Sequence, residues 1–389
     1  MTSPRSSASK PFTPALSGSL FYLVNFLCVG SYLPFINVYF AELGLSGKQI
    51  GLISSLGPIM SLLLSTTVAS FADRNRRRVR ITQGSLVGIT IVVFLLRMPT
   101  SFANIALLML FMAIFASPTM AISEGLIARM AQRHHLNYGA MRLWGSLGYA
   151  FSALVFGAFW QAFGFKAMFL VGGSLYLPLI WLTGQLEEGP IIPPQERKPF
   201  THLLRDRGLL LLLVATFLAG VSNSVAMTFS GIYAHSLGAG NFLIGAMIAV
   251  GALAELPMMF LSDRLSHRIR RTNTVLLAYA LMAASYLGYV LTKNPNLLPV
   301  LSILKGFGYA LWITVTIRMV TERTPEEWAS TAQSLLTLCM YGLSQLVAGP
   351  LGGWINDAIS PAAVFGFGVI ALALAALVLW LASRRVDLG

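Results

Sequence analysis

Twelve long apolar runs, separated by short polar segments, make up most of the 389-residue chain. A helix that crosses the hydrocarbon core of a bilayer needs roughly 20 apolar residues, and each run is about that long. The runs lie near residues 15–40, 49–71, 81–98, 102–127, 140–163, 166–183, 208–235, 241–261, 273–292, 297–317, 330–355 and 361–383. The pattern predicts an all-α membrane protein with twelve transmembrane helices.

Composition supports the same class of protein. Hydrophobic residues make up 56% of the chain and charged residues 11%, which is too little polar surface to cover a soluble globule. The first apolar run follows Arg5 and Lys10 in the manner of a signal peptide, but it is too long for one. We therefore expect an uncleaved first span and a lipid bilayer around the protein.

The cations are unevenly distributed along the chain. The net charge of +13 is compatible with a nucleic-acid partner. However, 22 of the 27 Lys and Arg residues fall in segments that lie on one side of the membrane if the amino terminus is cytoplasmic. Because cytoplasmic loops are enriched in cations, we expect both termini in the cytoplasm and the protein in the cell (inner) membrane. Nucleic acid is then not needed as a partner.

Short sequence echoes indicate that the chain is duplicated. They recur at nearly one offset and in the same order: Asp73-Arg74 and Asp263-Arg264 are 190 residues apart, IARM and TIRM 189, and SALVFG and SQLVAG 192. Such self-similarity predicts two pseudo-symmetric six-helix halves, 1–183 and 208–389. The Pro-rich, charged segment 184–207 would be a cytoplasmic linker.

Two parallel halves of this kind suit a monomeric transporter with a small-molecule substrate site at mid-membrane. Of the fourteen acidic residues, only Glu124 and Glu255 lie within the apolar runs. An ionised group in hydrocarbon is costly, so each carboxyl should face a partner or a watery cavity. We therefore expect these two glutamates to be the groups that exchange transported protons.

Two cations accompany these acids. Arg142 opens the fifth run, and we expect it to face Glu124 across two neighbouring helices. Lys305 lies inside the tenth run, where its side chain either extends outward to the interface or pairs with Glu255. Both cations are candidate substrate contacts, together with Glu124.

Other polar or aromatic residues should lie at a similar depth in spans of both halves. Singly, each such residue is more often a packing group or an interhelical hydrogen bond than a ligand contact. Together they would line a central cavity: Asn25, Tyr149, Asn223, Trp312 and Gln345.

The Asp-Arg loops resemble the signature between helices two and three of the major facilitator superfamily, although Ala69 replaces one of its usual glycines. The resemblance implies that the loops latch a cytoplasmic gate, whereas the alternative is that they are only solvated cytoplasmic charge. The gate residues would be Asp73, Arg74, Asp263 and Arg264.

The run YGAMRLWGSLGYA, with its arginine eighteen residues after Glu124, resembles the helix four to five region of lactose permease and its oligosaccharide/proton symporter relatives. The resemblance implies that Glu124 and Arg142 contact the solute and that Tyr149 stands where that family has a sugar-stacking tryptophan. Lys305 in LKGFGYALW resembles the lysine of the permease's tenth helix. Gly308 replaces a coupling residue of that helix, as does Leu311.

The segments NSVAMTFSGIYAHSLG and IGAMIAVGALAELPMMF are similar to the phenylpropionate-transporter-like branch of the superfamily. From the resemblance and the embedded charges we expect proton-coupled symport of a small organic solute. An aromatic carboxylate is the first candidate for that solute. The alternatives are a sugar, oligosaccharide or nucleoside symporter, an exporter that works by proton antiport, and a lipid flippase.

No sequence motif predicts an enzyme, a metal site or a cofactor. The chain contains no HExxH motif and no membrane-embedded Ser/His/Asp set. Cys28 and Cys339 lie within apolar runs at no metal-ligand spacing, so we interpret both as packing residues.

Overall fold

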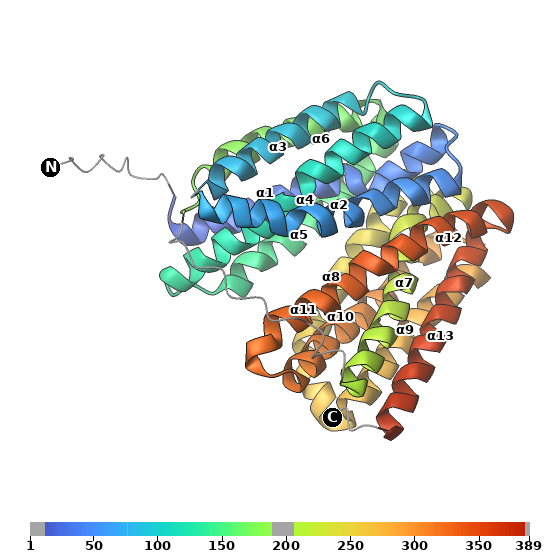
Figure 1. Ribbon diagram of the computed structural model, residues 1–389. Coiled ribbons are helices and arrows are strands. Elements are labelled where there is room, and N and C mark those ends of the chain that lie inside the picture. Colours follow the sequence, from blue (N-terminus) through green and yellow to red (C-terminus); the bar gives the residue numbers. More distant parts are fainter. Residues whose placement is uncertain (1–11, 76, 189–205, 386–389) are drawn as a thin grey trace.

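The computed structural model describes residues 12–75, 77–188 and 206–385, and all its regular elements in these ranges are helical (Figure 1). The helices are α1 Pro14–Glu42, α2 Gly47–Arg74, α3 Arg78–Leu95, α4 Phe102–Arg133, α5 Tyr138–Phe163, α6 Met168–Thr183, α7 Arg207–Ser236, α8 Asn241–Ile269, α9 Arg271–Leu291, α10 Leu298–Arg323, α11 Ala329–Thr337, α12 Ser344–Ala358 and α13 Pro361–Arg385. A π-helical segment, Leu338–Leu343, joins α11 to α12. These elements form twelve spans long and apolar enough to cross a membrane, which confirms the predicted fold class.

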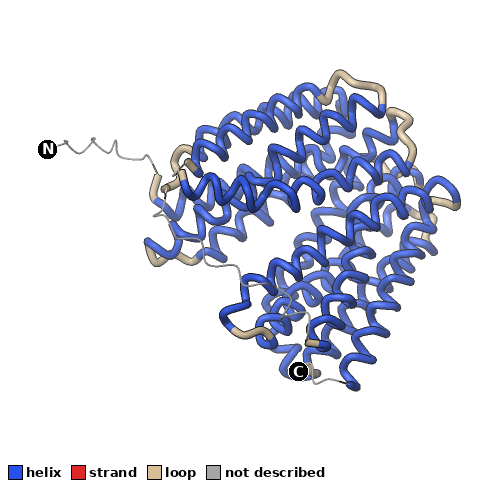
Figure 2. Tube along the Cα trace, viewed as in Figure 1, coloured by secondary structure: helices blue, strands red, loops and turns tan. Residues whose placement is uncertain are grey.

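The helices form two bundles. Helices α1 to α6 pack against one another, and α7 to α13 do the same. In Figure 1 the blue-green bundle and the yellow-red bundle converge at one end and diverge at the other. The loops lie at the two ends of the bundles (Figure 2). We call the end where α1 and α7 finish the closed end, and the end where they begin the open end.

Contacts between the halves are made mainly by α5 with α8 and by α2 with α12. Helix α1 also meets α7 and α8, and α2 meets the π-helical segment. At two of these crossings, glycines let the backbones approach closely. A Cβ atom on Gly51 would overlap the Gly349 carbonyl, and one on Gly245 would overlap the Ala153 carbonyl. Larger residues at these positions would therefore separate the helices.

The predicted linker meets well-defined helices on both sides. Helix α6 ends at Thr183, and α7 begins at Arg207. Residues 189–205 of the predicted linker lie outside the described residues. The division into 1–183, 184–207 and 208–389 stays a prediction.

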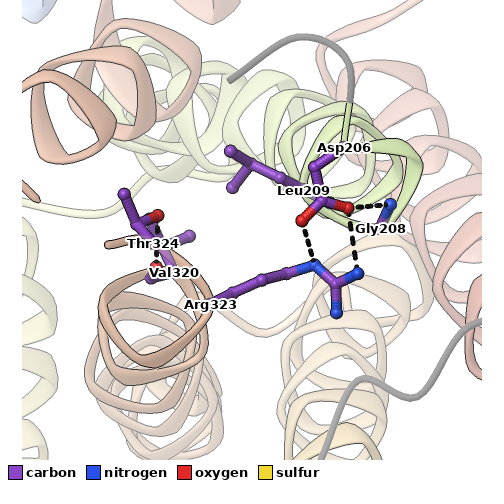
Figure 3. A network of polar contacts seen from close by, with 6 residues as sticks. All are labelled: Asp206, Gly208, Leu209, Val320, Arg323 and Thr324. Carbon is purple, nitrogen blue, oxygen red and sulfur yellow. Dashed lines mark hydrogen bonds and ion pairs between the residues drawn. The ribbon is translucent and has the colours of Figure 1, made fainter. Parts of the chain in front are cut away.

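Helix α7 begins at a capped and ion-paired aspartate (Figure 3). Asp206 accepts hydrogen bonds from the Gly208 and Leu209 N–H groups, at 2.8 and 3.3 Å. Arg323 of α10 donates to both carboxylate oxygens, Nε to Oδ2 at 2.8 Å and Nη2 to Oδ1 at 2.9 Å. Partial burial alone would raise the pKa of Asp206, but these hydrogen bonds and the Arg323 charge hold it below its ordinary value.

Candidate functional site

The predicted acid–base pair of the first half is present. Glu124 on α4 and Arg142 on α5 lie with Oε1 and Nε 3.7 Å apart, and both side chains are about one-third to two-fifths exposed. The short α4–α5 turn makes the two helices antiparallel neighbours, so residues on either side of it can face each other. Each charge is thus balanced within a membrane-length helix pair.

Aromatic rings of α1 hold the arginine. The Arg142 guanidinium carbon lies 4.6 Å from the centre of the Phe26 ring and 5.2 Å from that of Tyr22, both within cation–π range. The Tyr22 hydroxyl is 2.9 Å from the Tyr138 hydroxyl. A Cβ atom at Gly145 would lie 2.8 Å from the Phe26 ring and 3.0 Å from Arg142, so this glycine leaves room for the guanidinium.

Tyr149, the predicted stacking residue, lies on the same side of α5. Its ring meets Phe26 edge-on, with the ring centres 6.4 Å apart. It is also close enough to Glu255, in the other half, for the two to interact electrostatically. This interaction relates Tyr149 to a charge of the other half, and its predicted contact with a solute stays a prediction.

The acid and base of the second half are near each other but not joined. Glu255 on α8 and Lys305 on α10 interact electrostatically. Within the described part of the chain, neither one has an ion pair within 4.0 Å. The contact recorded for the Lys305 ammonium is the Met227 sulfur on α7, at 3.7 Å.

Two tyrosines complete this second cluster. The Tyr309 hydroxyl on α10 is 2.7 Å from the Tyr341 hydroxyl. Tyr341 lies in the π-helical segment, a distortion that is frequent at functional sites. Tyr309 interacts electrostatically with both Glu255 and Arg142, and so connects the two acid–base pairs.

Sequence reasoning missed the two tyrosine pairs, and it also missed Phe26 and Met227. One signal was available, because Tyr309 follows Lys305 by four residues and so lies on the same helix face. The others come from helices whose rotation the sequence does not give.

The remaining predicted cavity residues are more deeply buried. Asn25, Asn223 and Trp312 are 7%, 3% and 0% exposed, respectively. Gln345 donates from Nε2 to the Thr228 hydroxyl at 3.1 Å, which joins α12 to α7 within the second half. All four are buried in this conformation, and their predicted contact with a solute stays a prediction.

The predicted gate residues lie at the open end, where the halves diverge. The Asp263 carboxylate pairs with Arg318 of its own half, with Oδ1 and Nη1 2.8 Å apart. Arg74 and Arg264 are exposed, and the side chain of Asp73 lies outside the described residues. A latch between the halves therefore stays a prediction for a conformation in which this end is shut.

Metal-ion chemistry has no candidate ligand set in the part of the chain that the structure describes. No group of three or more His, Cys, Asp or Glu side chains is placed to hold an ion there. What the site does offer is two carboxyls, two cations and a wall of tyrosine and phenylalanine rings.

A family model decides the class of the protein. The model of the MFS_1-like family matches residues 16–367, which is most of the chain. The chain belongs to this family. It is a membrane transporter of the major facilitator type, not an enzyme, and small-molecule transport is the activity its relatives share.

Relatives of this transporter differ in their named substrates. It is 29% identical over 369 residues to a maltose permease of Geobacillus stearothermophilus, with 94% of each chain covered. It is 24% identical to a protein of Escherichia coli K12 named as a probable 3-phenylpropionic acid transporter, over 67% of this chain and 70% of that one. The phenylpropionate resemblance is thus the weaker of the two.

Solved structures support the fold. A crystal structure of a variant of the nucleoside transporter NupG matches with a TM-score of 0.86 at 15% identity, covering 95% of this chain and all of that one. A bacterial homologue of the human lysosomal transporter Spinster, in an inward-facing and unoccupied conformation, matches with a TM-score of 0.73 at 15% identity, covering 95% and 96%.

Proposed function

We propose that this protein is a proton-coupled symporter of a small organic solute that works by alternating access. The observation that carries the proposal is the pair of acid–base clusters, one from each half, that approach each other between the halves. Glu255 interacts electrostatically with Tyr149 of the other half, and Arg142 with Tyr309, which supports one site with charge from both halves. A site divided in this way changes its surroundings when the halves rock.

The conformation fits one stage of such a cycle. The halves touch at the closed end and diverge at the open end, which carries the cation-rich loops (Figure 1). If these loops and both termini are cytoplasmic, the site faces the cytoplasm. In this proposal the protein is a monomer in the cell membrane.

Coupling follows from charge balance in the second half. While Glu255 is ionised, its charge balances that of Lys305 nearby. When a proton binds to Glu255, the Lys305 charge is left without a counter-ion, and a solute carboxylate can then supply one. Proton and carboxylate therefore enter together. After both are released, the empty protein returns to its outward-facing conformation with the charges of Glu255 and Lys305 balancing each other.

The solute that suits these groups best is an aromatic carboxylate. Lys305 would bind the carboxylate, and the rings of Tyr149, Phe26 and Tyr309 would pack against the aromatic part. The relative named as a probable 3-phenylpropionic acid transporter supports this substrate class.

A second solute class has a specific observation in its favour. The maltose permease relative is matched over almost its whole length. The Glu124–Arg142 pair, set against aromatic rings, offers acceptors and donors to sugar hydroxyls without needing a net charge on the solute. A sugar would then occupy the first half of the site and leave Lys305 less involved.

Uptake by purified protein in liposomes tests both candidates. We expect an inward proton gradient to drive accumulation of 3-phenylpropionate, with alkalinisation of the external medium when solute is added. Accumulation of maltose in place of 3-phenylpropionate would support the second candidate. Uptake of either solute with no response to the proton gradient would contradict proton coupling.

A further inference from the structure

Two helix crossings toward the closed end join the halves, and the internal symmetry relates one crossing to the other. Gly51 of α2 lies on Gly349 of α12, and Gly245 of α8 lies on Gly157 of α5. Gly51 and Gly245 are 194 residues apart, and Gly157 and Gly349 are 192 apart, so these are corresponding positions of the duplicated unit. Internal symmetry therefore makes the crossings comparable residue by residue.

One turn nearer the closed end, the α2–α12 crossing carries a charge. Gly47, the first residue of α2, lies against Gly353, which has no side chain to keep the helices apart. The Asp357 carboxylate of the second half accepts the Gly47 N–H at 2.7 Å and the Lys48 N–H at 2.9 Å. The amino terminus of a helix of one half is thus capped by a carboxylate of the other.

The α5–α8 crossing has a neutral group at the corresponding place. There Gln161 occupies the position of Gly353, and its Oε1 accepts the Phe242 N–H at 2.9 Å. The Asn241 amide donates to the Trp160 carbonyl at 3.4 Å. These bonds hold α8 to α5 without an ionised group.

We propose that Asp357 is a positioning residue of the transport cycle: it locks α2 to α12 at the closed end, while the α5–α8 crossing acts as the pivot. A carboxylate at a helix amino terminus gains from both the free N–H groups and the helix dipole, and charge-assisted hydrogen bonds are about twice as strong as neutral ones. Opening this end must break both bonds to Asp357. The inference goes beyond the proposed function, because it depends on neither the solute nor the coupled ion.

Other polar contacts between the halves toward this end are neutral or long. The Asn37 amide on α1 donates to the Thr228 carbonyl on α7 at 3.0 Å, and a neutral hydrogen bond is weaker than a charge-assisted one. The His235 ring and the Glu42 carboxylate are 4.0 Å apart, and both side chains are more than two-fifths exposed. Exposed pairs of this kind contribute little. Asp357 is exposed as well, but it makes two bonds shorter than 3.0 Å to N–H groups at a helix amino terminus, so its loss should move the equilibrium most.

Distances between spin labels at the two ends test the lock. The label pairs would be Lys166→Cys with Lys293→Cys at the closed end and His135→Cys with Glu326→Cys at the open end, in a Cys28→Ala, Cys339→Ser background in lipid nanodiscs. Asp357→Asn leaves one oxygen acceptor and places an NH₂ group near backbone donors. We expect it to increase the population open at the closed end about tenfold relative to the parent.

Gln161→Leu is the matched variant at the pivot, and we expect a smaller change from it. Gly47→Ala tests the same crossing from the other half, because its Cβ would lie 2.6 Å from Asp357 Oδ1, 2.6 Å from Asn356 Nδ2 and 2.9 Å from the Gly353 carbonyl oxygen. If Asp357→Asn does not fold, Gly47→Ala takes its place, and we expect it to increase the population open at the closed end. Unchanged distances in both lock variants, or a larger opening in Gln161→Leu, would overturn the proposal.

Discussion

The two acid–base clusters of this transporter differ in how tightly they are held. In the first half, Arg142 lies 3.7 Å from Glu124 and over two aromatic rings. In the second half, Glu255 and Lys305 interact without contact, and the lysine touches a methionine sulfur. The first cluster is assembled before a ligand arrives, and the second is not.

This difference suggests a division of work between the halves. A joined pair keeps a constant charge and suits the recognition of a solute's shape and hydrogen-bonding groups. A separated pair is open to a proton on the acid and to an anion on the base, so it suits coupling. Substitutions in each cluster test whether the two differ in this way.

The largest effect is expected from Glu255→Gln. Because the amide cannot exchange a proton, accumulation should fall to the equilibrium level, a loss of about tenfold for an inward gradient of one pH unit. Exchange of labelled for unlabelled solute across the membrane should remain. Liposome uptake with and without the gradient measures both.

Glu187→Gln is the control for that variant, since this carboxylate lies at the open end beside His134. It should leave accumulation unchanged. Full gradient-driven accumulation by Glu255→Gln would mean that the second cluster does not carry the proton.

Lys305→Met should come next in size. Removal of a cation that binds the solute carboxylate should raise the KM for 3-phenylpropionate by about tenfold or more, because hydrogen bonds to charged groups contribute about 1.5–3 kcal/mol. The KM for maltose should change little. Initial uptake rates over a range of solute concentrations give the KM for each solute. Equal changes in KM for 3-phenylpropionate and maltose would mean that Lys305 does not act by binding a carboxylate.

In the first cluster, Arg142→Lys should have a smaller effect and raise the KM for the solute by about fivefold. Lysine keeps the charge but loses the planar group that stacks on Phe26 and Tyr22. The response to the proton gradient should be unaltered, because this cluster is not expected to change its charge. Loss of gradient dependence in Arg142→Lys would show that the clusters do not divide the work.

The smallest effect concerns the starts of α1 and α7, which also differ between the halves. Thr13 caps α1 with one long bond of 3.4 Å, whereas Asp206 caps α7 and binds Arg323. Asp206→Asn keeps a capping oxygen but loses the charge that pairs with Arg323, so it should lower the free energy of unfolding by about 1 kcal/mol.

The effect of Asp206 should also depend on pH. The pKa of Asp206 is lower in the folded protein, so its contribution is complete above the ordinary pKa of about 3.9 and is lost as the pH falls through the folded value. The difference between the unfolding temperatures of the parent and Asp206→Asn should therefore be constant from about pH 5 to 8 and should become smaller below about pH 4. A gap that widens on acidification would contradict this reading of the ion pair.

The twelve spans and the Glu124–Arg142 contact could be predicted from the sequence, because length, apolarity and a short turn determine them. The sequence does not predict which face of a span is turned toward the interior of the bundle. Lipid is as apolar as the interior of the bundle, so apolar positions mark both faces and only polar residues discriminate. Asn223 and Trp312 show the limit, since both are buried in this conformation and their predicted contact with a solute stays a prediction.

Contacts across the halves were also beyond the sequence. Asp357 reaches Gly47 across 310 residues of chain, and this contact depends on the tilt and register of helices from separate bundles. Within the second bundle, Tyr341 reaches Tyr309 from a π-helical segment, a distortion that the sequence does not reveal. The glycines at the closed end could be seen in the sequence, but their partners could not.

The central claim is that Glu255, and not Glu124, takes up the transported proton. A pH electrode in lightly buffered liposome suspensions tests it when 3-phenylpropionate, or maltose if that is the solute taken up, is added to parent, Glu255→Gln and Glu124→Gln proteins. The account predicts alkalinisation with the parent, none with Glu255→Gln, and alkalinisation at higher solute concentration with Glu124→Gln. Alkalinisation that persists in Glu255→Gln and disappears at every solute concentration in Glu124→Gln would contradict it.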